Sequence, residues 1–351
     1  MRVGLPREIK DGEARCVLTP RGVQELVRAG HAVHVEPGLG AGAGFADRAY
    51  GEAGGTLDDP WQAEFIVKVK ELQPPEYRRP REGQTVFCFQ HFGPEPPLLE
   101  AALASGASFV AFETVGQDDG SLPILAPMSA IAGRLSVQVG AWCLQKQNGG
   151  AGVLLPGAAG VPPGRVAILG AGNVGANALA VAHGIGAEVT VITKTRRRTD
   201  ALRAHYPGAR FLTDGLDDAV AGADLVIGAV LTPGQLSPKL IRRDLLRAMR
   251  PGSALVDVGI DQGGIAETSR PTSHSAPTYL EEGVVHYCVP NMPAAVARTA
   301  SLALESAVLP FLLDLLSGRS SAALRTGWQV RAGKVTHEHL ARDTGRAFHP
   351  A

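Results

Sequence analysis

The segment formed by residues 165–195 constrains the fold of this chain more than any other. Residues 166–169 are an apolar run typical of a buried strand, residues 176–186 carry the small side chains of a closely packed helix, and residues 188–192 have the pattern of a second strand. Residues 170–175, Gly-Ala-Gly-Asn-Val-Gly, stand between the first strand and the helix. A strand, a G-x-G-x-x-G turn, a helix and a strand within about 30 residues are typical of a dinucleotide-binding unit.

The glycines of this turn have separate physical roles. Gly170 makes the tight turn, Gly172 lets the backbone approach a pyrophosphate, and Gly175 lets the helix pack closely on the strand. The helix start offers N–H groups and the positive end of its dipole to the phosphates. We therefore predict cofactor contacts from these glycines and from Asn173 and Val174; the alternative is an ordinary strand–helix turn.

The residues after the second strand indicate which dinucleotide is bound. NAD-binding units place an Asp or Glu about 20 residues after the glycines to hold the ribose 2′-hydroxyl. This chain has no carboxylate there to repel a 2′-phosphate, and it offers hydroxyls and four cations to bind one. NADP(H) is therefore the preferred cofactor, with NAD(H) possible, although such basic runs are often solvated turns. The predicted contacts are Thr193, Lys194, Thr195, Arg196, Arg197 and Arg198.

Composition limits the class of protein. A length of 351 residues suggests two domains, and 45% hydrophobic with 19% charged residues is typical of a soluble globular protein. With 34 basic and 34 acidic residues, nothing indicates a nucleic-acid or membrane partner. No run approaches the 18 or more apolar residues of a membrane span. Four scattered cysteines without a C-x-x-C pair favour the reducing cytoplasm, and no metal site is expected.

The rest of the chain repeats a strand–helix rhythm. This rhythm predicts an α/β fold of two Rossmann-like, doubly wound parallel-sheet domains with a cleft between them. We expect residues 1–128 plus 300–351 to form a discontinuous substrate and catalytic domain, and residues 129–299 to form the dinucleotide-binding domain. Thr19 is a candidate N-cap before Pro20. The Arg-rich tail from Gly318 is expected to be partly mobile.

Two polar residues follow strands of the first domain. Lys70 ends the apolar run that starts at Phe65, and His91 follows the run that starts at Val86. Ligands of doubly wound sheets bind beyond the carboxyl ends of the strands, so both side chains are site candidates by position. Without further information, Lys70 could equally cap a strand and His91 could be an ordinary loop histidine.

Several motifs resemble those of the alanine dehydrogenases, over roughly residues 1–317 and in the same order. They are Arg2–Lys10 with Glu13-Ala14-Arg15, Lys68–Glu71, Ala126–Ser129, Ala132–Arg134, Asp257–Gly264, Ser269–His274 and His286–Pro293. The chain is therefore identified as a member of that family, which includes transhydrogenase alpha subunits.

The resemblance implies reductive amination, in which a 2-oxoacid and ammonia form an imine that the reduced nicotinamide attacks with hydride, or the reverse oxidative deamination. It implies that Arg15 and Lys70 hold the substrate carboxylate and carbonyl, and that His91 and Asp261 handle protons. A guanidinium fork suits a carboxylate, and histidine suits proton transfer near neutrality. Further implied contacts are Met128 and Asn291 for the substrate, and Ser129, Val230, Leu231, Ile260 and Asp261 for the cofactor.

The sequence also departs from the family pattern. Thr193 replaces the family's acidic residue, Leu72 replaces the proline of Lys-x-Lys-Glu-Pro, and residues 89–92, Phe-Gln-His-Phe, replace Tyr-Leu-His-Leu. Leu135 replaces the methionine of Gly-Arg-Met, and residues 293–299 depart from Pro-Gly-Ala-Val-Pro-Arg-Thr. Because the charged residues remain while their apolar neighbours change, the same chemistry could act on another oxoacid or on a substituted imine.

Three alternatives stay open at this point. An imine reductase or secondary-amine dehydrogenase of the opine or saccharopine type would use an amine in place of ammonia. Transhydrogenase subunits share the fold but are NAD-linked and dock on membrane partners, and a cofactor-binding sensor would have an inactive site. Relatives assemble as hexamers, so a homo-oligomer is expected, built partly through the helix of residues 129–147.

Overall fold

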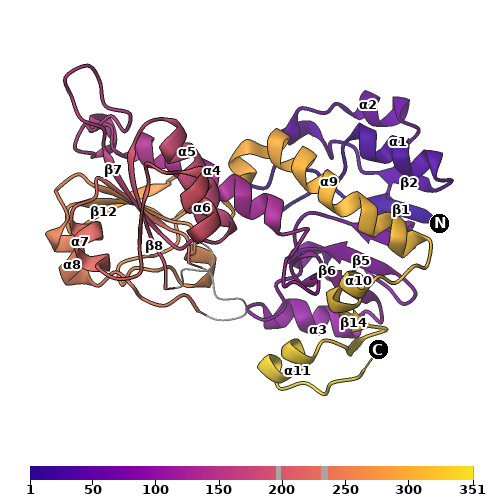
Figure 1. Cartoon of the computed structure of the whole chain (residues 1–351). Coiled ribbons are helices and arrows are strands. Elements are labelled where there is room, and N and C mark those ends of the chain that lie inside the picture. The colour runs from indigo at the N-terminus through magenta and orange to yellow at the C-terminus, as the bar shows by residue number, and fades with distance from the viewer. Residues whose placement is uncertain (195–198, 231–235, 351) are drawn as a thin grey trace. The chain divides into compact units, whose positions relative to one another are not determined.

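The computed structural model describes residues 1–194, 199–230 and 236–350, which divide into two compact units. Unit 1 comprises Met1–Met128 and Ala294–Ala351, and unit 2 comprises Ser129–Pro293. Each unit is built on a sheet with helices packed against it (Figure 1). The α/β fold predicted from the strand–helix rhythm is confirmed.

Unit 1 contains an eight-stranded sheet in the order β15-β14-β6-β5-β4-β1-β2-β3. The six strands of the first 128 residues run parallel, because helices return the chain between them. These elements are β1 Arg2–Leu5, α1 Pro20–Arg28, β2 Ala32–Val35, α2 Asp47–Glu52, β3 Thr56–Leu57, β4 Phe65–Val67, β5 Thr85–Cys88, α3 Pro96–Ala104 and β6 Ser108–Ala111. Short 3₁₀ turns occur at η1 Ala41–Ala43, η2 Pro60–Gln62, η3 Pro74–Glu76 and η4 Phe112–Thr114.

The tail that follows Gly318 is folded, although its sequence predicts a partly mobile segment. It folds into α10 Ala322–Gly327, β14 Trp328–Arg331, β15 Lys334–Val335 and α11 Glu338–Thr344. Strand β14 pairs antiparallel with β6, which makes the sheet mixed (Figure 1). Val330, Val335 and Leu340 are buried in the hydrophobic core of unit 1. The expectation of a partly mobile tail was wrong, because a few apolar residues among many charges suffice to complete a sheet edge.

Unit 2 contains a seven-stranded sheet in the order β12-β13-β11-β10-β7-β8-β9, parallel except for the β12–β13 hairpin. The predicted strand–helix–strand segment is present as β7 Arg165–Leu169, α5 Asn173–Gly184 and β8 Glu188–Ile192. Strands β10 and β11 are buried along their whole length, as central parallel strands are. The other elements are η5 Lys146–Asn148, α6 Thr199–His205, β9 Arg210–Leu212, α7 Leu216–Ala221, β10 Leu225–Gly228, α8 Arg243–Ala248, β11 Ala254–Asp257, η7 Ile260–Gln262, β12 Thr278–Glu281 and β13 Val284–Tyr287.

The chain passes from one unit to the other at two places, and a long helix lies at each. Helix α4 spans Ala126–Cys143, so it begins and ends earlier than the predicted range of 129–147. The second crossing passes through η8, Met292–Val296, into α9, Ala297–Leu316. By length and composition alone, the segment Met292–Leu316 is apolar enough to cross a membrane, although charged residues interrupt its apolar runs. One side of α9 packs inside unit 1, however, and it carries the buried, charged Glu305.

Glu305 supplies the cap that the start of α1 requires. Thr19 occupies the N-cap position and Pro20 follows it, but the Thr19 side chain makes no capping bond. Instead, Glu305 Oε2 accepts the N–H groups of Thr19 at 2.6 Å and of Gly22 at 3.1 Å, and its Oε1 accepts from Arg21 Nε at 3.0 Å. A Cβ at position 22 would lie 2.6 Å from this carboxylate, so only glycine fits there. A residue remote in sequence thus replaces the expected local cap.

Replacing Glu305 with leucine should destabilise unit 1. The variant leaves the N–H groups of Thr19 and Gly22 buried without their acceptor, which costs about 2 kcal/mol in the free energy of unfolding. Urea denaturation measures the change. Glu25→Gln, on the exposed face of α1, is the matched control and should change stability by less than about 0.5 kcal/mol. Equal stability of both variants would contradict the capping role.

Candidate functional site

Lys70 and His91, the two candidates chosen by position, lie together beyond the ends of β4 and β5. Backbone hydrogen bonds between the two chain segments continue past the strand ends. Lys68 N–H donates to Phe87 O at 3.2 Å, and Phe89 N–H donates to Val69 O at 3.0 Å. Lys70 Nζ consequently lies 3.3 Å from His91 Nε2. The rings of Phe89 and His91 stack with their centroids 6.1 Å apart, and Lys70 Nζ lies 5.8 Å from the Phe89 centroid.

The backbone at His91 is held in an uncommon conformation. Its φ of +50° lies in the left-handed region, which costs a non-glycine residue about 1 kcal/mol or more. Glu113, in the turn after β6, accepts the N–H of His91 at 2.9 Å and that of Gln90 at 3.1 Å. Two successive N–H groups around one carboxylate form a small anion-binding concavity. These charge-assisted bonds offset the strain and fix the direction of the His91 side chain.

Arg15 is almost completely buried, with 2% of its surface exposed. Glu13 binds its guanidinium in a two-pronged arrangement, with Nε to Oε1 at 2.7 Å and Nη2 to Oε2 at 2.5 Å. Arg15 Nη1 lies 3.2 Å from Met128 Sδ. The structure therefore brings together two of the predicted substrate residues, and Glu13 fixes the plane of the guanidinium for a further anion.

Glu71 adds a buried carboxylate to the Lys70–His91 pair. Its Oε1 accepts from Lys10 Nζ and its Oε2 lies 3.9 Å from His91 Nε2. Burial raises the pKa of Glu71, but the charges of Lys70, His91 and Lys10 outweigh burial, and the pKa of this carboxyl lies below its usual range. Glu71 is therefore an anion beside two candidate catalytic groups.

A second buried cluster holds the backbone that presents Lys70. Lys68, fully buried, donates to Glu76 Oε1 at 2.8 Å and lies 3.4 Å from Glu8 Oε2. Glu8 Oε1 accepts the N–H of Val69 at 2.6 Å, and Glu8 Oε2 lies within 3.4 Å of the N–H of Lys70. Burial raises the pKa of Glu8 to about 7, although the Lys68 charge opposes the change.

In unit 2, the glycine-rich turn has the geometry that a dinucleotide requires. Gly170 has a φ of +111°, and a Cβ there would lie 2.5 Å from Ala229 O. A Cβ on Gly175 would collide with Gly170 O, so glycine is needed for the close packing of α5 on β7. Helix α5 begins at Asn173, and its N-cap residue Gly172 has no side chain to occupy the helix start. These residues fit a dinucleotide pyrophosphate.

The turn after β11 carries Asp261 and is held by Asp257. Asp257 Oδ2 accepts from Ile265 N–H at 2.7 Å and from Ser269 Oγ at 2.5 Å, and burial raises its pKa. Gly264 has a φ of +73°, and a Cβ there would lie 2.5 Å from Asp257 Oδ2. Ile260 is buried and Asp261 is exposed within η7. This arrangement fixes the turn and leaves the Asp261 side chain at the surface of unit 2.

For the remaining predicted site residues, the structure gives the backbone conformation, the burial or a single hydrogen bond. Asn291 has a φ of +57°, again in the left-handed region. Thr193 N–H donates to Leu212 O at 3.0 Å beyond the end of β8, and Lys194 is exposed. Ser129 and Val230 are half-buried. Thr195, Arg196, Arg197, Arg198 and Leu231 lie outside the described residues.

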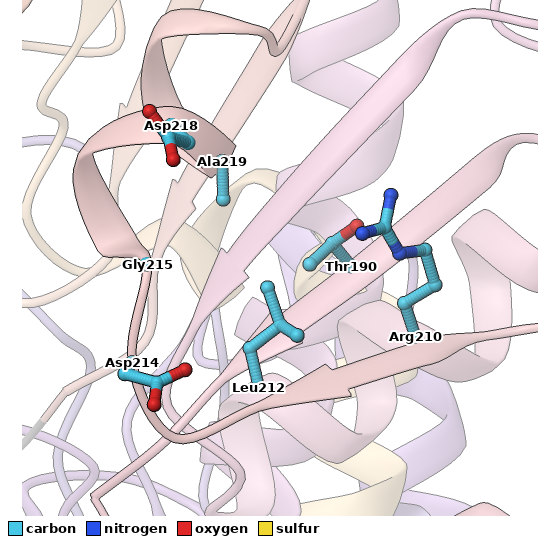
Figure 2. A pocket seen from close by; sticks show the side chains of 7 residues that line it. All are labelled: Thr190, Arg210, Leu212, Asp214, Gly215, Asp218 and Ala219. Atoms are coloured by element: carbon cyan, nitrogen blue, oxygen red, sulfur yellow. The ribbon is translucent and has the colours of Figure 1, made fainter.

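A hollow of about 280 Å³ lies elsewhere in unit 2, between β8, β9 and α7. Figure 2 shows its lining, with Arg210 and Thr190 from the strands and Asp218 from α7. The lining, which also includes Leu212, Asp214, Gly215 and Ala219, contains none of the predicted site residues. This hollow is therefore not the predicted catalytic or cofactor-binding site. Within the described ranges, no group of three or more His, Cys, Asp or Glu side chains could hold a metal ion.

Sequence reasoning missed the carboxylates that support the site. Glu8, Glu71, Glu113 and Asp257 bind backbone N–H groups or cationic side chains there, yet none was chosen as a candidate. Glu71, Glu113 and Asp257 stand at or just after strand ends, by the same rule that selected Lys70 and His91. That rule, applied to acidic residues, could have found these three.

Comparison with known proteins identifies the family of the chain. Residues 4–132 match the family model described as alanine dehydrogenase/PNT, N-terminal domain, and residues 136–341 match the corresponding C-terminal domain. The chain is 49% identical to an alanine dehydrogenase of Halomonas elongata, over 99% of this chain and 98% of that protein. It matches a solved L-alanine dehydrogenase at 44% identity with a TM-score of 0.95, covering 98% and 99% of the two chains. A transhydrogenase structure from Sinorhizobium meliloti, 24% identical with a TM-score of 0.84 over 96% of this chain and 99% of that one, shares the fold.

Glu8 should make stability depend on pH. The folded protein holds a proton on Glu8 up to a pKa of about 7, whereas the unfolded chain releases it near 4.5. Between these values the folded state binds more protons, so the stability of wild type relative to Glu8→Gln should fall as pH rises, by at most about 1.4 kcal/mol per pH unit. Urea denaturation of both proteins at pH 5 and pH 7.5 measures this. A constant difference between them would contradict the prediction.

Proposed function

The chain belongs to the alanine dehydrogenase/PNT family as a nicotinamide-dependent oxidoreductase of CH–NH2 groups, and we propose that it catalyses reductive amination of a small 2-oxoacid and the reverse oxidative deamination. The observation that carries the proposal is the 3.3 Å approach of Lys70 Nζ to His91 Nε2, in the same unit as the buried Arg15–Glu13 pair. These groups offer a cation for an oxoacid carbonyl, a proton-transfer group and a guanidinium for a carboxylate. Unit 1 is thus proposed as the substrate unit and unit 2 as the nucleotide unit.

Arg15 and Lys70 are proposed to bind the oxoacid. Arg15 would take the carboxylate, because Glu13 fixes the orientation of its planar fork. Lys70 would donate to the carbonyl oxygen and so polarise the carbon toward attack by ammonia. Met128 lies 3.2 Å from Arg15 Nη1 and would supply apolar contact for a small side chain. Asn291 is assigned to the substrate by the family motif.

His91 and Asp261 are proposed to handle protons. Loss of water from the carbinolamine needs a group that gives and takes a proton near neutral pH, and histidine does so. Lys70 Nζ lies 3.3 Å from His91 Nε2, and because an ammonium can only donate, this nitrogen would present its lone pair and could accept a proton. Asp261, a carboxylate, would orient ammonia or water and stabilise positive charge on the iminium.

The proposed cofactor is NADP(H), with NAD(H) possible. Gly170, Gly172, Asn173, Val174 and Gly175 would hold the pyrophosphate, and the bound cofactor would supply hydride to the imine carbon. Thr193 and Lys194 stand after β8 with no carboxylate to repel a 2′-phosphate, which supports the preference for the phosphorylated cofactor. Ser129, Val230 and Ile260 are assigned to the cofactor by the family motifs.

The protein is further proposed to be a cytoplasmic homo-oligomer that has no nucleic-acid or membrane partner. A mainly apolar hollow of about 330 Å³ on unit 2 is lined by Ala141 of α4, by residues 145–147 after this helix, by residues 152–156 and by Ile185. Leu154 and Ile185, 62% and 40% exposed, both line this hollow, and exposed apolar side chains that gather in one place are more typical of interaction surfaces than scattered ones. This surface supports self-association, and the family resemblance points to a hexamer.

The first test compares oxidation of NADPH and NADH with pyruvate and ammonia. NADPH should be preferred by roughly tenfold or more in kcat/KM, because charge-assisted bonds to the 2′-phosphate are worth about 1.4 kcal/mol or more. Thr193→Asp should reverse the preference by repelling the 2′-phosphate, while Thr193→Ser, the matched control, keeps it.

Each other outcome of this assay has a definite meaning. Turnover with NADH alone would show that the cofactor proposal is wrong and leave an NAD-linked alanine dehydrogenase. Cofactor binding without turnover would favour the alternative, an imine reductase or an opine- or saccharopine-type secondary-amine dehydrogenase, to be tested with a panel of oxoacids and amines. Strict dependence on ammonia excludes that alternative.

Light scattering tests the oligomer. Wild type should have six times the 36.6-kDa mass of one chain, and Leu154→Arg should lower the mass by placing a charge in the apolar hollow. Leu280→Arg is the matched control, because Leu280 is also 62% exposed but lies on β12 outside the hollow. A monomeric wild type would contradict the assembly.

A further inference from the structure

One nitrogen of His91 lies near two groups of opposite charge. His91 Nε2 is 3.3 Å from Lys70 Nζ and 3.9 Å from Glu71 Oε2. An ammonium only donates hydrogen bonds, so Nε2 must present its lone pair to Lys70. A carboxylate only accepts, so Nε2 must carry a proton to bond with Glu71. The protonation state of Nε2 therefore decides which of the two neighbours it can bind.

Glu71 is fixed in place as an acceptor. Its Oε1 accepts from Lys10 Nζ and lies 3.4 Å from Gln73 Nε2, while its backbone carbonyl accepts from Gln73 Nε2 at 3.0 Å. Its Oε2 is buried and accepts no hydrogen bond from any residue that the structure describes. Only 6% of the Glu71 side chain is exposed, against 39% for His91. A desolvated acceptor without a donor is costly, so it favours a donor that can reach it.

We propose that Glu71 is a positioning residue that receives the Nε2–H of His91 whenever His91 holds the proton of the reaction. This inference rests on the proposed function, in which His91 transfers that proton. In the deamination direction, the water oxygen bonds to the iminium carbon while the C=N π pair moves to nitrogen and neutralises its positive charge. One O–H bond of the water breaks, and its proton forms the Nε2–H bond. No electrons leave the system in this step. Nε2 then donates to Glu71 Oε2 instead of accepting from Lys70.

The charges around His91 determine how the proposal can be tested. Lys70 places a positive charge 3.3 Å from His91 Nε2, Glu71 places a negative charge 3.9 Å from it, and Lys10 binds the other oxygen of Glu71. Other ionisable groups lie one step farther away, among them the buried thiol of Cys88, which is near Glu71 and Glu113. They also include Glu113 on the backbone N–H groups of residues 90 and 91, Glu8 on the N–H of Lys70, and Tyr77 near Glu71.

The test is the pH dependence of kcat/KM for oxidation of L-alanine by the full-length protein. This reaction needs His91 as a base, so its rate falls at low pH where His91 is protonated. Glu71→Gln removes the negative charge and should move the acid limb to lower pH by about one unit. Lys10→Met removes the opposing charge and should move the limb to higher pH. Glu64→Gln, which removes a carboxylate before the other end of β4, should leave the limb in place.

The opposite signs separate electrostatics from structural damage, because a loosened site would change the rate of both variants without moving their limbs apart. Coincident profiles for wild type and Glu71→Gln, or shifts of equal sign in both variants, would overturn the proposal. If Glu71→Gln fails to fold in a thermal melt, Lys10→Met decides alone, since the Lys10 side chain is 37% exposed. Absence of turnover in wild type would instead refute the proposed function.

Discussion

Buried or half-buried carboxylates bind backbone N–H groups left without ladder partners, and both units depend on this interaction. In unit 1, Glu8 holds the segment that leads to Lys70, and Glu113 holds Gln90 and His91. In unit 2, Asp257 holds the turn that carries Asp261. Each carboxylate loses hydration on burial, and only charge-assisted bonds to several donors offset that loss. Each of these bonds therefore fixes a candidate catalytic loop as well as satisfying the backbone.

The electrostatic consequences are largest around Lys70. Lys68, fully buried, forms one layer with Glu8 and Glu76, while Lys70 and the more exposed His91 form a second layer with the buried Glu71. Anions and cations alternate through both layers, so each charge stabilises its neighbours in a region of low dielectric. Losing one member leaves an uncompensated buried charge, which is far more costly than losing an exposed ion pair. Glu8, whose pKa is raised to about 7, adjusts the charge of the lower layer near neutral pH.

Local sequence patterns predicted the site where short-range physics decides it. The Gly170–Gly175 turn follows from glycine geometry, and Lys70 and His91 follow from the rule that ligands bind beyond strand ends. Predictions for the cap of α1 and for the tail were wrong, because residues distant in sequence make the contacts there. Thr19 occupies the N-cap position, yet Glu305 from α9 supplies the bonds. The tail was expected to be partly mobile, yet β14 pairs with β6 because Val330 and Val335 find a core to fill.

The sequence by itself determined the α/β architecture, the dinucleotide-type turn, the family and the chemical types of the candidate residues. Apolar periodicity, glycine spacing and functional-group chemistry act over a few residues, so they can be read along one chain. Only the tertiary structure decided which charges meet. The contact of Arg15 with Met128, the place of Glu71 beside His91 and the hold of Glu113 on the left-handed backbone of His91 each require distant segments to converge. Their desolvation depends on everything packed around them.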